Sequence, residues 1–470
     1  MLEKLEKNIF FLAVSVVFLL FSLSLFIFKS RWGINDDVLM AMYASGKGFS
    51  NTPTEYLVYS NIIIGGILKK LYQAMPSFPL YGVYTFLILF ISFVALLYSL
   101  LTYKYSRARI FYFFIYFALF GLLFIRAPQF TMNAFMVGMS GMFLFLTALY
   151  KKRTDISSKT LIIISISIFF LVLSSLIRID SFFLVVILFS PFIFIEIAKS
   201  HFNRQIIGIF LIFSMSVSLL VFICHTYDKT SYLKDGRWTY QIEKAKLLAE
   251  MIDNNKMSEY SPRTKHIFDE AGWSRNDFIL LGNWFSADDK VFSKEKMEKF
   301  LLNIKQIPTQ RTTIHFKSMF ATPYFYGAVL LVIFFIVQIN EKKKKSIGII
   351  TSILVSLFLI IYLGYYVRLP ERVYLSILAF LSFLALFLAD SNIDLRPIKE
   401  WKEKFKLLFI ILFIGYFLFR HYTVNAIHRE ETAMFKQYVA QLRPVKDRVF
   451  LVWAGSFPIE LLSVFDNLDC

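Results

Sequence analysis

The chain has 470 residues, of which 57% are hydrophobic and only 18% are charged, and its formal net charge is +18. Its 55 phenylalanines exceed what the core of one soluble domain uses, so the composition excludes an ordinary soluble protein. The positive charge lies in short loops between apolar runs, which argues against a nucleic-acid partner and for contact with membrane lipids. We therefore expect an all-α polytopic membrane protein, because backbone groups in a bilayer core must bond within helices.

Eleven apolar runs approach the length of about 20 residues that a helix needs to cross a bilayer. The expected spans are residues 8–28, 81–102, 110–125, 132–150, 161–177, 181–196, 206–224, 323–339, 347–365, 373–389 and 407–419. The first run is too long for a signal peptide and lacks a small-residue cleavage site, so it is expected to stay as an anchor. Two cysteines, Cys224 and Cys470, indicate neither a disulfide framework nor a metal cluster.

Basic residues gather in alternate loops, and this pattern predicts the orientation of the chain. The basic loops are residues 104–109, 151–159, 199–205, 340–346 and 394–406. By the positive-inside rule they face the cytoplasm, which places the N-terminus inside the cell and the C-terminus outside. Four parts follow, namely an N-terminal transmembrane module (1–225), an outer helical subdomain (226–320), a C-terminal transmembrane module (321–420) and an outer tail (421–470).

The first outer segment, residues 29–80, contains a stretch with helical spacing of its apolar residues. This stretch is "TEYLVYSNIIIGGILKKLYQAMP", residues 54–76, and it opens with a further site candidate, Glu55. We expect a helix that lies in the plane of the lipid headgroups. Treating it as a twelfth span would place every later basic loop outside, so we reject that alternative.

The long outer loop carries helical patterns at residues 239–252, 261–272 and 293–304. Between them, "GWSRNDFILLGNWF" offers Asn276, Asp277 and Trp284 as an acceptor surface, since aromatic faces suit sugar rings. Packing in the core of a small subdomain explains the same residues equally well.

The outer tail is expected to be short and of mixed α/β structure. "RVFLVW", residues 448–453, has the pattern of a strand, and "PIELL", residues 458–462, has that of a helix start. So short a tail is expected to pack on the long loop rather than to fold alone.

Two adjacent carboxylates, Asp36 and Asp37, follow the first span in "INDDVLMAMYASG". The residues after them have helical spacing, so we expect the acids in a first helical turn, where unpaired amides favour negative charge. A carboxylate at the edge of a low-dielectric region has a raised pKa and suits the role of a general base. Simple capping of that helix explains the pair as well.

Charged residues also stand in short turns at the outer ends of later spans. Arg126 lies in "FIRAPQFTMN", Arg178 and Asp180 lie in "SSLIRIDSFF", and Arg368, Glu371 and Arg372 lie in "YYVRLPERVYLS". Such groups usually face a cavity, although snorkelling to the headgroups is the alternative. Guanidinium groups bind phosphate through paired hydrogen bonds, so the turns predict a phosphate-binding pocket with a carboxylate across from it. A sugar linked to a polyprenyl phosphate would fit there, with an aspartate removing the proton of an acceptor hydroxyl.

The first span, the outer loop that opens with "INDDVLM", the in-plane helix and about eleven spans resemble the GT-C superfamily. These are glycosyltransferases that use polyprenyl-phosphate sugars, and they include the lipid A aminoarabinose transferases and the protein O-mannosyltransferases. The resemblance implies an inverting transfer to a cell-surface glycan or glycolipid on the outer face of the cell membrane. It implies Asp36, in preference to Asp37, as the base and Arg368 or Arg372 at the donor phosphate. The WWD-type motif of oligosaccharyltransferases is absent from the sequence, which argues against N-glycosylation of proteins.

Two other functions share some of these features. A polymerase of O-antigen or capsule repeat units also uses outer arginines and lipid-linked donors. A transporter of lipid-linked oligosaccharides would need charged or helix-breaking residues near the bilayer midplane, which the sequence does not show. A divalent metal is left open, since Asp37 with Asp288 and Asp289 would supply oxygen ligands, but the spacing does not predict one.

Overall fold

The computed structural model of the protein describes residues 2–48, 50–151, 157–199, 203–252, 260–304, 314–339, 342–389, 401–442 and 458–466. These residues form helices and connecting turns, and they contain no strand apart from one antiparallel bridge between Arg31 and Ser463. The helices of the first half are α1 (Leu2–Ile27), α2 (Asn35–Ser45), α3 (Ile62–Ala74), α4 (Leu80–Tyr103), α5 (Arg107–Tyr116), the π-helical turn η1 (Phe117–Gly121), α6 (Leu122–Arg126), α7 (Phe130–Lys151), α8 (Ser158–Ile177), α9 (Ile179–Lys199) and α10 (Arg204–Leu233). Those of the second half are α11 (Gly236–Ile252), α12 (Lys265–Ala271), α13 (Arg275–Gly282), α14 (Lys294–Ile304), α15 (Ile314–Ala321), α16 (Pro323–Val337), α17 (Lys342–Tyr366), α18 (Glu371–Leu388), α19 (Trp401–Leu442) and the 3₁₀ turn η2 (Ile459–Leu461).

Nine helical stretches within the described residues are long and apolar enough to cross a membrane. Two further helices, which cover the expected spans 181–196 and 323–339, have shorter apolar stretches, Ile179–Ile195 and Pro323–Val337. The protein therefore has the architecture of a multi-pass helical membrane protein, with a helix at each expected span. The count of eleven crossings stays a prediction.

The centre of the bundle is α7, which packs against α4, α8 and α9. Small residues let α7 and α8 approach closely, as in other membrane bundles. A Cβ atom added at Gly138 would lie 2.6 Å from the Ser174 Oγ, so glycine is needed at this crossing. The Ser174 hydroxyl also donates a hydrogen bond of 2.7 Å to the carbonyl oxygen of Ala134. The close packing fixes the position of the loop before α7, which reaches the candidate site.

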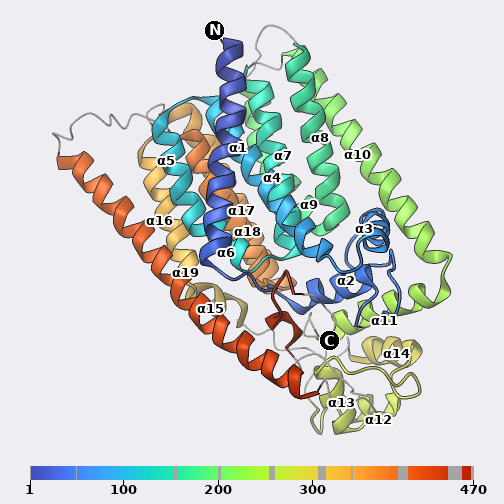
Figure 1. The fold of residues 1–470 in the computed structure, drawn as a ribbon. Helices are drawn as coiled ribbons and strands as arrows, with labels where there is room; N and C mark the ends of the chain where they lie inside the picture. The colour runs from blue at the N-terminus through green and yellow to red at the C-terminus, as the bar shows by residue number, and fades with distance from the viewer. Residues whose placement is uncertain are drawn as a thin grey trace.

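Two helices at the edge of the bundle, α10 and α19, are longer than the sequence predicted (Figure 1). The expected spans ended at residues 224 and 419, whereas α10 continues to Leu233 and α19 to Leu442. The helix α19 therefore continues through the first part of the expected outer tail, residues 421–442. Its polar sequence still consists largely of good helix formers, so the helix propagates without an apolar signal.

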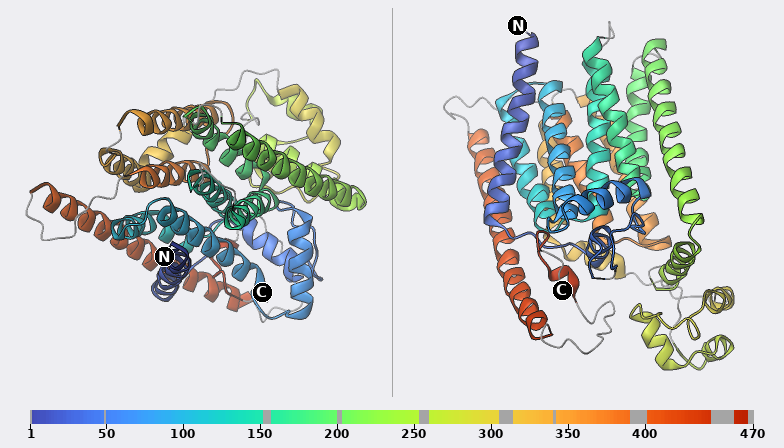
Figure 2. Two further views of the ribbon diagram at one scale, coloured as in Figure 1. Left: turned by 90° about the horizontal axis from the view of Figure 1, so that it is seen from above. Right: turned by 45° about the vertical axis from the view of Figure 1, so that its right-hand side comes forward.

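Figure 1 shows that α2, α3, α11 to α14 and the C-terminal segment all lie at one end of the bundle, opposite the N-terminus. Helix α3 runs across the bundle axis in both Figure 1 and Figure 2 and is not among the candidate spans, as expected for the in-plane helix. Asn61 caps α3, since its side chain accepts a hydrogen bond from the backbone of Ile63.

Helices α11 to α14 form a small subdomain with its own hydrophobic core. Phe268, Trp273 and Phe300 lie at the centre of this core, with ring centroids 4.9–5.0 Å apart for the Phe268–Phe300 and Trp273–Phe300 pairs. Trp238 at the start of α11 stacks on Tyr56 of the first outer segment, with ring centroids 5.1 Å apart. The first outer segment therefore contacts the start of the subdomain.

The described part of the C-terminal tail, residues 458–466, packs on the first outer segment and on α4 and α19, which corrects the expectation that it packs on the long loop. The backbone amide of Val464 donates to the Ser30 carbonyl at 3.3 Å, and the Phe465 ring stacks on Phe86 at 5.1 Å. The predicted strand at residues 448–453 lies outside the described residues. Residues 459–461 form one 3₁₀ turn.

Candidate functional site

Asp36 and Asp37 lie in the first turn of α2, where the sequence predicted them. Asp37 is completely buried, and its Oδ1 accepts hydrogen bonds from the Tyr81 hydroxyl and from the Phe130 amide, both at 3.1 Å. Tyr81 belongs to α4 and Phe130 begins α7, so this carboxyl ties α2 to two helices of the bundle. Asp36 is half-buried beside it.

Burial is the main influence on Asp37, and it raises the pKa of this carboxyl well above its usual value. The negative charge of Asp36 raises the pKa further, whereas the hydrogen bonds from Phe130 and Tyr81 lower it. The charge of Arg372 also lowers it, although the net shift remains upward. Asp37 therefore keeps its proton to a higher pH than an exposed aspartate does, and its buried position suits a structural role.

The interaction with Arg372 brings distant parts of the chain together. Arg372 is half-buried in the first turn of α18, and its charge acts on Asp37 in α2. Arg368 is half-buried in the preceding turn between α17 and α18. A guanidinium group from the second half of the chain therefore lies near the acidic pair of the first outer segment.

Arg178 approaches the same site from the junction of α8 and α9. Its guanidinium lies 5.6 Å from the ring centroid of Phe130 and 6.0 Å from that of Tyr59. It also pairs with Asp180, with the Arg178 Nη2 and the Asp180 Oδ2 2.8 Å apart. Arg178 thus contacts Phe130, whose amide bonds the buried Asp37 carboxyl. The exposed carboxylate of Asp180 already balances the charge of Arg178.

Arg126, the last residue of α6, contacts a residue of α19. Its side chain is only 5% exposed, and its Nη1 lies 3.4 Å from the Nδ1 of His428. Tyr324 of α16 lies beside Arg126. The charge of Arg126 acts on Glu371, which is exposed at the start of α18. The charge of Arg126 thus reaches the residue next to Arg372, whose own charge reaches Asp37. That the arginines line one pocket stays a prediction.

Glu55 has a structural partner. Its Oε2 lies 2.5 Å from the Nζ of Lys69 on α3. Partial burial favours a higher pKa for this carboxyl, but the hydrogen bond and the charge of Lys69 outweigh that effect and lower the pKa. The pair ties the loop before α3 to the helix.

Of the three residues proposed as an acceptor surface in the outer subdomain, one has a position that the fold explains. Asp277 forms a capping box with Ser274 at the start of α13, where each side chain bonds the other's backbone amide. Trp284 is 36% exposed and has a φ of +62°, and Asn276 is exposed. The neighbouring Trp273 is buried and donates its indole N–H to the Val291 carbonyl. Core packing thus accounts for Trp273.

The residues considered as metal ligands are engaged within the protein. Asp289 accepts a hydrogen bond from Lys244, and the buried Asp37 accepts hydrogen bonds from Tyr81 and Phe130. Among the described residues, no three His, Cys, Asp or Glu side chains gather in a group that could hold a metal ion.

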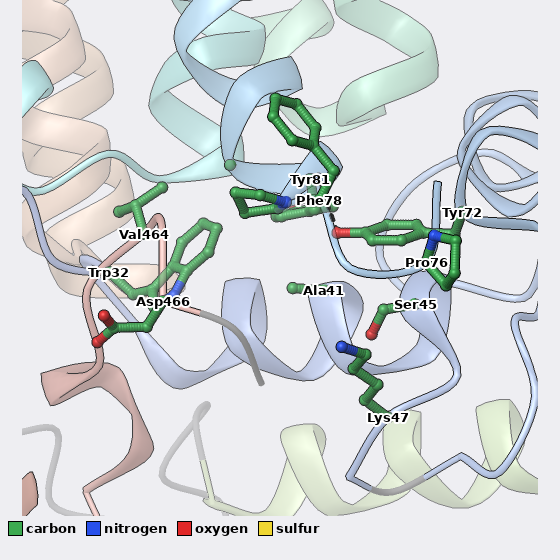
Figure 3. Close-up of a pocket in the computed structure, with 12 residues that line it drawn as sticks. Trp32, Ala41, Ser45, Lys47, Tyr72, Pro76, Phe78, Tyr81, Val464 and Asp466 are labelled. Carbon is green, nitrogen blue, oxygen red and sulfur yellow. Dashed lines mark hydrogen bonds between the residues drawn. The ribbon is translucent and has the colours of Figure 1, made fainter. Parts of the chain in front are cut away.

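A small pocket that the sequence did not reveal adjoins the acidic pair (Figure 3). It has a volume of ≈ 20 Å³ and is lined by the rings of Trp32, Tyr72 and Tyr81 together with Ser45 and Lys47. The Tyr72 hydroxyl accepts a hydrogen bond of 2.9 Å from the Tyr81 amide. Tyr81 thus separates this pocket from the buried carboxyl. The tyrosines at the start of the second span, in "LYGVYTF", are the sequence signal that could have indicated it.

No protein-family model, curated protein or solved structure matches this chain.

Proposed function

We propose that this protein is an integral-membrane glycosyltransferase that moves a sugar from a polyprenyl-phosphate donor to a glycan or glycolipid acceptor. The observation that supports the proposal is the electrostatic effect of Arg372 on Asp37, the neighbour of Asp36 in the first turn of α2. A guanidinium group that could bind phosphate and a candidate base would thus come from opposite halves of the chain to one end of the bundle. A donor with its phosphate at headgroup level and its tail in the bilayer could reach that end.

In this mechanism Asp36 is the base. Asp37 is completely buried and its Oδ1 already accepts two hydrogen bonds, so an acceptor hydroxyl could not reach it. Asp36 accepts the proton of the acceptor hydroxyl while the hydroxyl oxygen attacks the anomeric carbon. The bond between that carbon and the phosphate oxygen breaks, and polyprenyl phosphate leaves with the bonding electrons. Arg372, with Arg368 in the turn before α18, balances the charge that develops on the phosphate.

The end of the bundle that carries α2 would face the outside of the cell. This orientation rests on the alternate basic loops of the sequence, which would then face the cytoplasm. The outer segments 29–80 and 226–320 would carry most of the sequence that lies outside the spans, so they would shape the acceptor site.

The test compares carboxylate variants for restoration of cell-envelope glycolipids and glycans in a strain that lacks the protein. Asp36→Asn should lower the glycosylated product at least about a hundredfold, the usual loss when a general base is removed. Asp180→Asn is the matched control, because it neutralises an exposed carboxylate that pairs with Arg178 at the same end of the bundle. It should leave most of the product intact. Equal product from Asp36→Asn and the unaltered protein, at equal amounts in the membrane, would refute the assignment of the base.

The products also separate this proposal from polymerisation and address the metal. Addition of one sugar to each acceptor supports transfer, whereas ladders of repeat units would indicate a polymerase. Chelation that abolishes transfer, with recovery on adding Mg²⁺ or Mn²⁺, would place a divalent metal in the reaction.

A further inference from the structure

A basic groove lies where the end of α1 meets the outer part of α19 and the C-terminal segment. It has a volume of ≈ 410 Å³. Its charged lining residues are Lys29, Arg31, Arg429, Lys436 and Asp466. Two of the cations are balanced within the protein, since Arg31 pairs with Glu431 at 2.6 Å and Lys436 with Asp466 at 2.8 Å. In the part of the chain that the structure describes, Lys29 and Arg429 have no carboxylate partner.

A contact between α1 and α19 shows the level of this groove along the two helices. The Arg429 guanidinium donates a hydrogen bond of 2.9 Å to the carbonyl oxygen of Ile27, the last residue of α1. The groove therefore lies where the first span ends, which is the level of the lipid headgroups. Beyond Arg429, α19 continues to Leu442 and extends about 20 Å further, at 1.5 Å per residue. Figures 1 and 2 show α19 passing the end of α1 and continuing beyond it.

The helices that form the groove present apolar side chains to the outside. Phe26 of α1 is 88% exposed, and Phe419 and Tyr422 of α19 are 67% and 63% exposed. These side chains precede the groove along each helix, on the side of the bilayer core. A ligand with a charged head and long apolar chains would cover both the cations and these surfaces.

A buried guanidinium adds positive charge behind the groove. Arg126 contacts His428, which lines the groove, and its Nε has no hydrogen-bond partner among the described residues. Because the Arg126 side chain is buried, solvent and salt screen its charge poorly, and this charge strengthens the positive potential at the groove. This arrangement gives Arg126 a role that does not depend on the acidic pair.

We propose that this groove binds the phosphate of an anionic membrane lipid. Lys29 and Arg429 would bond the phosphate oxygens, Arg126 would add its charge from behind, and the chains would lie along the exposed apolar faces of α1 and α19. This inference does not rest on the proposed glycosyl transfer, because it concerns a separate cluster of residues and a binding event without chemistry.

The experiment measures lipid bound to the full-length protein in nanodiscs of phosphatidylcholine with a minor fraction of phosphatidylglycerol. Native mass spectrometry of the released protein counts the phosphatidylglycerol molecules retained, as their fraction is varied. Lys29→Ala/Arg429→Ala should weaken retention at least about tenfold, because two charge-assisted contacts are lost. The matched control is Lys265→Ala/Arg275→Ala, which removes two exposed cations from the outer subdomain and should retain the lipid as the unaltered protein does.

Three further arms keep the test decisive. Lys29→Arg/Arg429→Lys keeps both charges and should restore most of the binding, which a folding defect would not allow. Arg372→Ala should leave retention unchanged, so a failure of the transfer proposal is distinguishable from a failure of this one. Inorganic phosphate alone should not displace the lipid at an equal concentration. Unchanged retention in the double alanine variant, equal losses in the control pair, or full displacement by inorganic phosphate would overturn the proposal.

Discussion

Replacing Asp37 by alanine removes the acceptor that two buried donors share. The Tyr81 hydroxyl and the Phe130 amide both bond its Oδ1 at 3.1 Å, and the residue is inaccessible to water. An unpaired buried donor costs about 1–3 kcal/mol, so Asp37→Ala should lower the free energy of unfolding by about 2–6 kcal/mol. Asp37→Asn keeps an oxygen with two lone pairs and should lower it by less than about 2 kcal/mol.

The difference between these variants should depend on pH in a definite direction. The folded protein raises the pKa of Asp37 well above 3.8, so it holds this proton to a higher pH than the unfolded chain does. The stabilisation from the protonated carboxyl is therefore complete at low pH and is lost as the pH rises through the folded-state pKa. Asparagine does not titrate, so the stability of Asp37→Asn does not fall in this way. The difference in stability between Asp37→Asn and the unaltered protein should therefore be smallest, or favour the variant, at the upper end of the pH range.

The assay is thermal unfolding of the purified protein in one detergent, at a fixed scan rate because such unfolding is often irreversible. The apparent Tm is measured for the unaltered protein, Asp37→Ala and Asp37→Asn from acidic to neutral pH. If Asp37→Asn lost as much stability as Asp37→Ala at every pH, the hydrogen-bond argument would be wrong. If Asp37→Asn abolished transfer while the apparent Tm stayed high, the base would have to be reassigned from Asp36 to Asp37.

Three further changes test the packing at the same end of the bundle. Gly65→Ala should destabilise the protein by about 1–3 kcal/mol, because the new Cβ would clash with the carbonyl oxygen of Glu55. Gly66→Ala is its matched control, since no atom lies within 4 Å of the new Cβ, and it should be neutral or raise the apparent Tm. Arg178→Lys keeps the charge but loses the planar contact with two aromatic rings, so a fall of about 0.5–1 kcal/mol is expected, and an unchanged apparent Tm would show that the rings contribute nothing. Tyr81→Phe should cost about 1 kcal/mol and steepen the pH dependence of the apparent Tm, because the hydroxyl lowers the pKa of the buried carboxyl; a flatter profile would contradict this.

Hydropathy predicted the helices of the bundle well, because a backbone in lipid has few ways to bond its polar groups. It could not predict how far α10 and α19 continue beyond the apolar runs. The polar residues from Thr423 to Leu442 carry no hydropathy signal, and only their helix propensity extends α19. The docking of the C-terminal segment was also missed, since the hydrogen bond from Val464 to Ser30 joins backbone groups and leaves no side-chain pattern.

The sequence singled out the acidic pair but could not tell its two members apart. Asp37 is buried because Tyr81 and Phe130 come to it from α4 and α7, and those contacts depend on the packing of the whole bundle. The same limit applies to the arginines. All of them stand in similar short turns, yet Arg372 acts on the pair whereas Arg126 contacts His428 on α19. Sequence position predicted that they lie in turns at the ends of helices but could not predict their neighbours.

The hydrogen bond between Val464 and Ser30 joins one of the first loops to leave the ribosome with a segment that leaves after α19. During synthesis the acidic pair of α2 is therefore made long before the segment whose backbone bonds Ser30 and Trp32. A nascent chain halted after α19 would contain both carboxylates and every arginine discussed above, and Arg31 could already pair with Glu431. The contacts of the first outer loop with residues 462–464 would still be missing, so the packing at this end of the bundle is completed only after α19 has been made.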